Sequence, residues 1–275
     1  MEQTKLNNLK SIAAKIRLGA LEGVHAAASG HPGGSLSIAE LITYLYFVEM
    51  NVDPKNPKDA NRDRFVLSKG HTAPALYAAL AEKGFFDKEL LGTLRKFGSI
   101  LQGHPDMKHT PGVDMSSGSL GLGISAAAGM ALSAKITGDS YRVYTILGDG
   151  ESEEGQVWEA AMFSAHYKLD NLCAFIDWNG LQIDGKVTEV MNPTPLDEKF
   201  AAFGWNVLVI DGHDFDQIAA ACEAAKACKG KPTAIVCKCV KGKGVSFMEN
   251  QVGWHGKAPN KEQYEMAVAE LSASV

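Results

Sequence analysis

The residues best suited to chemistry are an acid and an amide that each follow a predicted β-strand. Asp149 follows the apolar, β-rich segment 142–147 after one glycine, and Asn179 comes just after the similar segment 172–176. Between them, residues 154–168 carry apolar side chains at helical spacing, which indicates a strand–helix–strand unit. Because parallel strands joined by a helix end at the same edge of a sheet, we expect Asp149 and Asn179 to lie side by side.

The ligands at these two positions favour a hard metal ion that also contacts a phosphate. A carboxylate oxygen from Asp149 and an amide oxygen from Asn179 suit Mg²⁺ or Ca²⁺ better than zinc. Gly148 and Gly150 flank the acid, and Gly150 leaves room for a phosphate to approach backbone N–H groups. The following helix directs its N-terminus at the same place. A lone Gly-Asp-Gly is usually an ordinary turn, but the matching strand ends favour a metal-bridged diphosphate site.

Composition limits the class of protein. The chain has 275 residues, 45% of them hydrophobic and 21% charged, which is typical of a globular α/β protein. The formal net charge of −5, without a basic tract, argues against a nucleic-acid partner. The N-terminus lacks the layout of a signal peptide and no apolar run could span a bilayer, so we expect no membrane association. The 5 cysteines, without a Cys-x-x-Cys pair, suit a reducing compartment and predict a cytoplasmic protein.

Strands and helices alternate along the chain, which favours an α/β fold with one doubly wound, mostly parallel sheet and helices on both faces. Further strands are predicted at 64–67, 204–210 and 232–239. A helix is expected over residues 1–30, and Ser37 with Glu40 resembles a capping box for a helix that reaches about Met50. Because no repeat, low-complexity tract or linker interrupts the chain, we expect residues 1–275 to form a single domain.

Four loops place a histidine directly beside a glycine. These histidines are His31, His71, His104 and His255. One loop histidine is usually a solvated or turn-forming residue, but four such loops in one domain are harder to explain in that way. Imidazole suits phosphate binding, hydroxyl recognition and proton transfer near neutral pH. His71 follows the strand at 64–67, so we expect its loop at the edge that carries Asp149. His213 is expected only to order its own turn.

Several segments occur in the order seen in transketolases, and this resemblance runs nearly from end to end. The segments are Ser29–Gly33, Arg62–His71, Gly103–Asp106, Gly118–Gly121, Gly148–Gly150 with Asn179, Asp211–His213 and Trp254–Gly256. The Gly-Asp-Gly with its later asparagine is similar to the thiamine diphosphate motif. The match covers only the diphosphate-binding domain of that much longer enzyme. The chain therefore resembles the N-terminal subunit of a split transketolase, which would work with a C-terminal partner subunit, as an α2β2 hetero-oligomer, on sugar phosphates.

The resemblance implies a role for each matched residue. Mg²⁺, or Ca²⁺ or Mn²⁺ in its place, would be bound by the side chains of Asp149 and Asn179 and the backbone carbonyl of Leu181. Thiamine diphosphate would be bound by His71, Gly118, Ser119, Leu120, Gly148, Gly150, Glu154, Ile183 and His255. His31 and His104 would face the hydroxyls of the donor sugar and help to move protons, and His255 would contribute to catalysis as well as to diphosphate binding. Ser119 stands where the family usually has proline.

The implied reaction moves a two-carbon ketol unit from a ketose phosphate to an aldose phosphate. The family's activating glutamate and its phosphate-binding arginines belong to the next domain, which this chain lacks. One alternative is another enzyme of the superfamily, such as a deoxyxylulose phosphate synthase or a 2-oxoacid decarboxylating subunit. Another is a non-catalytic cofactor-binding partner. The Gly-His-Pro sequences at His31 and His104 favour sugar handling over pyruvate, and the metal pair favours catalysis.

Overall fold

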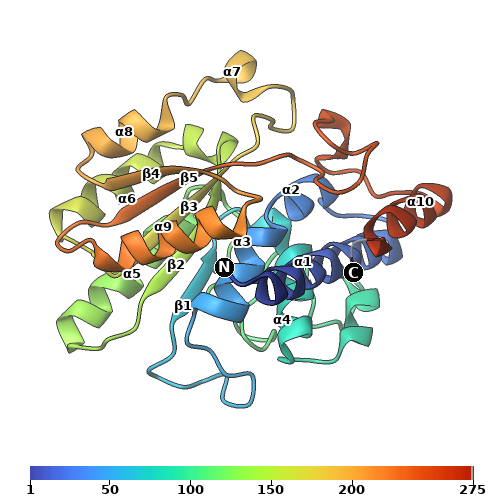
Figure 1. Cartoon of the computed structure of the whole chain (residues 1–275), viewed down its shortest axis with the longest axis horizontal. Coiled ribbons are helices and arrows are strands. Elements are labelled where there is room, and N and C mark those ends of the chain that lie inside the picture. The colour runs from blue at the N-terminus through green and yellow to red at the C-terminus, as the bar shows by residue number, and fades with distance from the viewer. Residues whose placement is uncertain (274) are drawn as a thin grey trace.

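A computed structural model describes residues 1–273 and 275, and its centre is a parallel sheet (Figure 1). Five strands lie in the order β1-β2-β3-β5-β4, and every neighbouring pair is parallel. Their bounds are Arg64–Leu67 for β1, Val143–Gly148 for β2, Leu172–Trp178 for β3, Asn206–Asp211 for β4 and Thr233–Lys238 for β5. The strands predicted from β-rich runs are confirmed, with ends that differ by one or two residues.

Helices cover both faces of the sheet, as the alternating pattern predicted. Their bounds are Gln3–Ala26 (α1), Pro32–Ser37 (α2), Ala39–Tyr44 (α3), Ala73–Lys83 (α4), Leu122–Thr137 (α5), Gly155–His166 (α6), Val187–Val190 (α7), Leu196–Ala202 (α8), Phe215–Ala227 (α9) and Lys261–Ser272 (α10). One apolar core joins α1, α3, α4 and α9 to one face of the sheet, and a second joins α5, α6 and α8 to the other. The strands read as nearly continuous apolar runs because both of their faces are buried.

The strand register brings the predicted site loops to one edge. Gly148 at the end of β2 pairs with Asp177 near the end of β3, and the Asp149 N–H donates to the Asp177 carbonyl at 3.2 Å. Leu67 at the end of β1 pairs with Ile146, so the loop after β1 leaves the sheet beside them. The carboxyl ends of parallel strands are the usual place for a ligand site in an open α/β sheet.

The segment between β5 and α10 closes this edge from one side. It packs in a third apolar core with α1 and α10, and α10 lies beside α1 in Figure 1. The Gly242 N–H donates to the Gly33 carbonyl at 2.9 Å, which ties this segment to the start of α2. The capping box of Asn260 and Gln263 begins α10. Among the described residues, no helix combines the length and apolar composition that crossing a bilayer requires.

The helix predicted from Ser37 to about Met50 is broken, and the predicted capping box is wrong. α2 ends at Ser37, α3 follows, and residues 45–49 form a π-helical turn. The Ser37 hydroxyl donates to Asp177 Oδ2 at 2.6 Å and lies 3.0 Å from the Gly34 carbonyl instead of capping a helix. The Glu40 carboxylate accepts two hydrogen bonds from Arg17. Contacts to residues distant in sequence therefore override the local capping signal.

Candidate active site

A cavity of about 380 Å³ lies at the carboxyl edge of the sheet and collects most of the predicted site residues. Those that line it are His31, His71, Gly118, Leu120, Gly148, Asp149, Gly150, Glu154, Asn179, Leu181, Ile183 and His255. Two predicted residues, His104 and Ser119, are not among its lining residues. The cavity therefore unites loops from β1, β2, β3 and β5.

Asp149 is a buried carboxylate held by backbone amides. Oδ1 accepts a hydrogen bond from the Gly150 N–H at 2.8 Å, and Oδ2 accepts one from the Gly180 N–H at 2.5 Å. These bonds leave lone pairs on both oxygens for another partner. Burial, followed by the nearby Asp177 charge, raises the pKa of Asp149 to about 7. A divalent cation would relieve this unfavourable burial of negative charge, which supports the prediction of a metal ligand.

The amide of Asn179 is oriented by its neighbours. Nδ2 donates to Asp177 Oδ2 at 2.9 Å, while Oδ1 accepts from the Leu181 N–H at 3.1 Å. The Asp177 carboxylate therefore holds Nδ2 of Asn179 toward itself and turns Oδ1 away. Oδ1 of Asn179 keeps a second lone pair for another partner. An oriented amide oxygen beside an oriented carboxylate fits the ligand set expected for Mg²⁺.

Leu181 and Lys241 meet at the lining of the cavity. The Lys241 ammonium donates to the Leu181 carbonyl at 2.9 Å and lies 2.9 Å from His255 Nδ1. Lys241 is 2% exposed, and within residues 1–273 and 275 it forms no ion pair with a carboxylate. Burial, and then the Lys69 charge, lowers its pKa to about 8. A buried cation of this kind favours an anionic ligand.

Three of the predicted histidines form one cluster. The ring centroids of His31 and His71 are 5.1 Å apart, those of His71 and His255 are 5.2 Å apart, and those of His31 and His255 are 5.5 Å apart. Burial is the first cause that lowers the pKa of each ring: that of His31 falls to about 4, that of His255 to about 3, and that of His71 lies well below its usual value. These lowered pKa values favour the neutral form of each ring at pH 7.

His104 and Ser119 lie beside the cavity but outside its lining. A Cβ atom at Gly118 would approach the His104 ring to 3.0 Å, so His104 packs against a residue that lines the cavity. The Tyr77 hydroxyl donates to the His104 carbonyl at 3.0 Å and fixes that loop. Ser119 is exposed and lines a neighbouring pocket with Leu122. His104 is thus near the other histidines without lining the cavity that would hold a cofactor.

Several residues of the site were not singled out from the sequence. Lys69 and Asp177 form a buried ion pair, and Glu151 accepts hydrogen bonds from the Gly121 and Gly148 N–H groups, both at 3.0 Å. Lys69 and Lys241 could have been found, because each stands beside a glycine in a loop at the predicted edge. Glu151 also stands beside a glycine, Gly150, whereas Asp177 lies inside an apolar strand and carried no such signal.

His213 does more than order its own turn. Its Nδ1 lies 2.9 Å from Glu40 Oε2, and its Nε2 accepts a hydrogen bond from the Val240 N–H at 2.9 Å. Because Nε2 is an acceptor, Nδ1 carries the proton and donates to Glu40. The ring therefore links α3 to the residue just before Lys241, and its own turn is held by Asp211, whose Oδ1 accepts from the His213 N–H at 2.8 Å.

Comparisons with known proteins agree with this fold. The family described as "Transketolase, thiamine diphosphate binding domain" matches residues 8–272. The 6-deoxy-6-sulfo-D-fructose transketolase subunit of Clostridium sp. strain MSTE9 is 51% identical over 96% of this chain and 96% of its own length. An apulose-4-phosphate transketolase subunit of Phocaeicola vulgatus is 44% identical over 98% of this chain and 96% of its own length.

Longer relatives match over only part of their length. Human transketolase is 42% identical over 100% of this chain, which spans 44% of the human protein. The crystal structure of Campylobacter jejuni transketolase superposes with a TM-score of 0.91 and 34% identity, over 96% of this chain and 42% of that one. The chain belongs to the transketolase family and corresponds to its N-terminal, thiamine diphosphate-binding domain.

Proposed function

We propose that the chain is the N-terminal subunit of a split transketolase that depends on Mg²⁺ and thiamine diphosphate. The reaction would transfer a two-carbon ketol unit from a ketose phosphate to an aldose phosphate. The observation that carries the proposal is the convergence of the Asp149–Asn179 pair, the buried Lys241 and three clustered histidines on one cavity. On this proposal, residues 1–275 form a single cofactor-binding domain.

The side chains around the cavity fit the two implied groups. Asp149, Asn179 and the Leu181 carbonyl would supply three hard oxygen ligands, and the diphosphate would supply others, because Mg²⁺ prefers octahedral coordination. In the described part of the chain, no cluster of three or more His, Cys, Asp or Glu residues is arranged to hold a metal, and phosphate oxygens or waters would complete the set. When bound, thiamine diphosphate supplies the carbanion-stabilising chemistry of ketol transfer.

The chain's own residues would bind, neutralise and move protons. Lys241, His71 and His255 would contact the diphosphate, and its negative charge would oppose the lowering of the pKa of both rings. His31 and His104 would face donor hydroxyls, where a neutral imidazole can accept a proton at one nitrogen and donate one at the other. Leu120 and Ile183 would contact the rings of the cofactor. Each of these roles rests on position in or beside the cavity.

We propose a partner chain because this chain matches some relatives over nearly their whole length and others over less than half of theirs. The chain covers 96% of two relatives named as transketolase subunits but 44% of human transketolase. We propose that a C-terminal subunit supplies the remaining half and that the assembly is an α2β2 hetero-oligomer. Glu154, which is exposed at the start of α6, would lie near this contact. The cytoplasm is the proposed compartment, because all 5 cysteines are free thiols.

The proposed donor is a ketose with an anionic end. One relative is named for 6-deoxy-6-sulfo-D-fructose and another for apulose 4-phosphate, so both belong in the assay beside xylulose 5-phosphate. The chain should first be combined with a candidate C-terminal subunit, and ketol transfer to ribose 5-phosphate should be followed by product analysis. Transfer from pyruvate alone, or no turnover with any cognate subunit, would contradict the proposal.

The metal site can be tested on the chain without a partner. Calorimetry should detect thiamine diphosphate binding with Mg²⁺ and lose it with EDTA. Asp149→Ala should abolish binding, because it removes the charged ligand, while Asp139→Ala, an exposed acid after α5, should bind normally. Unchanged affinity in Asp149→Ala or in EDTA would overturn the site assignment.

A further inference from the structure

Arg95 lies in a constrained loop between the two histidines that are proposed to handle the sugar. A 3₁₀ segment, Lys88–Thr93, precedes it. Arg95 follows with φ of +59°, a conformation that costs free energy for a residue other than glycine. Its N–H donates to the Leu101 carbonyl at 2.8 Å, so the loop closes on itself and holds this backbone.

The Arg95 guanidinium contacts both histidine-bearing loops. Nη1 donates to the Ser29 hydroxyl at 2.8 Å, two residues before His31. The other end lies over Gly103, the residue before His104. A Cβ atom at Gly103 would come within 3.1 Å of Arg95 Nε and 3.2 Å of Cζ, so only glycine admits this contact without displacement of the guanidinium.

The charge of Arg95 is not neutralised by an acid. Among residues 1–273 and 275, no carboxylate forms an ion pair with its guanidinium, and Nε is buried without a hydrogen-bond partner. His31 Nδ1 is likewise buried without a hydrogen-bond partner. No hydrogen bond at Nδ1 fixes this ring, so its environment depends on its loop and on nearby charges.

We propose that Arg95 is a positioning residue that fixes the loops of His31 and His104 relative to one another and keeps a permanent positive charge beside both rings. This inference rests on the proposed function for the sugar-handling role of the two histidines. The fixing of the two loops, which we call the clamp, rests on the contacts of the Arg95 guanidinium to Ser29 and Gly103. Lysine could supply the charge, but not the planar fork that makes both contacts.

The charge should keep both rings neutral. After burial, Arg95 is the first cause that lowers the pKa of His31 and also that of His104. The other cationic or titratable groups that face His31 are His104, Lys241, His71 and His255. A neutral ring can exchange a proton with a donor hydroxyl, whereas a protonated ring can only donate.

NMR titration of the histidine ring signals in the chain alone tests the inference without any turnover. In Arg95→Met the pKa of His31 and that of His104 should each rise by about 1. Arg95→Lys should keep both values near those of the wild type. Lys96→Met, which removes the exposed neighbouring charge, is the matched control and should change neither. Unchanged titration of both rings in Arg95→Met would overturn the electrostatic part.

Kinetics of the reconstituted enzyme test the clamp. Arg95→Met should lose kcat/KM for the donor about twofold between pH 7 and pH 5 while the wild type changes little, because a rise of about 1 in the pKa of His31, from about 4, protonates about half of that ring at pH 5. Arg95→Lys and Ser29→Ala should raise KM for the donor severalfold with an unchanged pH profile, and cofactor affinity should stay normal. Wild-type KM in both variants would overturn the clamp. An inactive wild type would instead contradict the proposed function and leave the NMR result standing.

Discussion

Three donors contact the same carboxylate oxygen of Asp177. Its Oδ2 accepts from the Ser37 hydroxyl at 2.6 Å, from Asn179 Nδ2 at 2.9 Å and from the Lys69 ammonium, while Oδ1 is buried without a hydrogen-bond partner. Although Asp177 is fully buried, the Lys69 charge lowers its pKa. This residue lies one layer behind the proposed metal and orients a proposed ligand. Such outer partners commonly control metal affinity.

Replacing Asp177 should therefore weaken metal-dependent cofactor binding. In Asp177→Asn the amide oxygen can still accept hydrogen bonds, but the negative charge that pairs with the buried Lys69 is lost, so Asn179 should be held less firmly and Mg²⁺-dependent affinity for thiamine diphosphate should fall about 10–100-fold. The control is Asp63→Asn, a buried carboxylate just before β1, at the opposite edge of the sheet. Calorimetry on folded samples gives both affinities. Equal losses in the two variants would reduce Asp177 to a general packing role.

The histidines should divide between cofactor and sugar. His71 lines the cavity, whereas His104 lies outside its lining. His71→Ala should mainly weaken cofactor binding. His104→Ala should leave cofactor affinity near normal and lower kcat/KM for the donor about 2- to 12-fold, the equivalent of one hydrogen bond of about 0.5–1.5 kcal/mol, and more if proton transfer is lost. If His104→Ala lost the cofactor while His71→Ala only raised KM, the two assignments would be reversed.

At the scale of elements, the sequence predicted strands and their common edge better than it predicted helix boundaries. Strands buried on both faces have strong apolar runs, so β2 and β3, and with them Asp149 and Asn179, could be placed before the structure was known. The break between α2 and α3 could not be predicted, because Glu40 pairs with Arg17, 23 residues away in the chain, and Ser37 donates a hydrogen bond to Asp177, 140 residues away. Local propensity carries no information about such partners.

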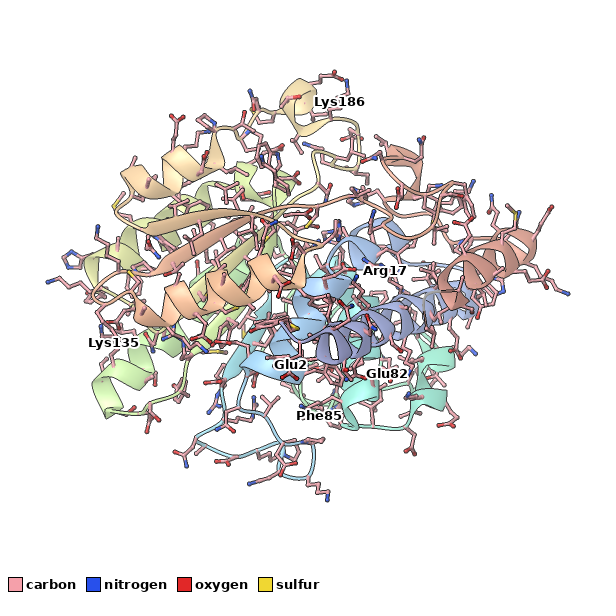
Figure 2. All side chains as sticks on the ribbon, viewed as in Figure 1. Glu2, Arg17, Glu82, Phe85, Lys135 and Lys186 are labelled. Atoms are coloured by element: carbon pink, nitrogen blue, oxygen red, sulfur yellow. The ribbon has the colours of Figure 1, made fainter. Side chains whose placement is uncertain are left out.

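The buried ion pair between Arg17 and Glu40 makes a testable contribution to stability. Arg17, labelled in Figure 2, donates to the two Glu40 oxygens at 2.7 and 2.6 Å, and His213 adds a third contact. Burial alone would raise the pKa of Glu40, but the Arg17 charge outweighs it and lowers the pKa to about 2. The carboxylate therefore favours the folded state above its unfolded pKa of about 4.5, and this benefit fades as the pH falls toward 2.

Glu40→Gln should destabilise the chain by about 3–5 kcal/mol at pH 7, because it leaves a buried guanidinium without a charge partner. Urea unfolding at pH 7 and at pH 4 should show a smaller difference from the wild type at the lower pH. Glu82→Gln, which removes an ion pair between partly exposed side chains of Glu82 and Lys88, is the control and should change the free energy of unfolding by at most about 1 kcal/mol. A difference that stays constant between the two pH values would show that Glu40 is not the titrating group.

At the scale of the whole molecule, one face carries apolar side chains without a cover. α5 and α6 present Leu122 at 51% exposure, Ile136 at 75%, Met162 at 63% and Phe163 at 36%. A groove of about 270 Å³ between these two helices is lined in part by Gly129 and Phe163. Large exposed apolar patches commonly mark protein contacts. α6 also begins next to the cavity, so a partner seated on this face would lie close to the cofactor site.

The chain alone should therefore be inactive and should gain activity only when a C-terminal subunit is added. Phe163→Glu places a charge in the groove between α5 and α6, so it should weaken assembly at least tenfold in analytical ultracentrifugation, because an unpaired charge is costly in a buried interface. The matched control is Met266→Glu on α10, where 49% of the residue is exposed. Phe163→Glu should still bind thiamine diphosphate with Mg²⁺ when alone, since the cavity is not altered. Normal assembly of Phe163→Glu would place the partner on another face, whereas turnover of a ketose phosphate by the isolated chain would remove the need for a partner.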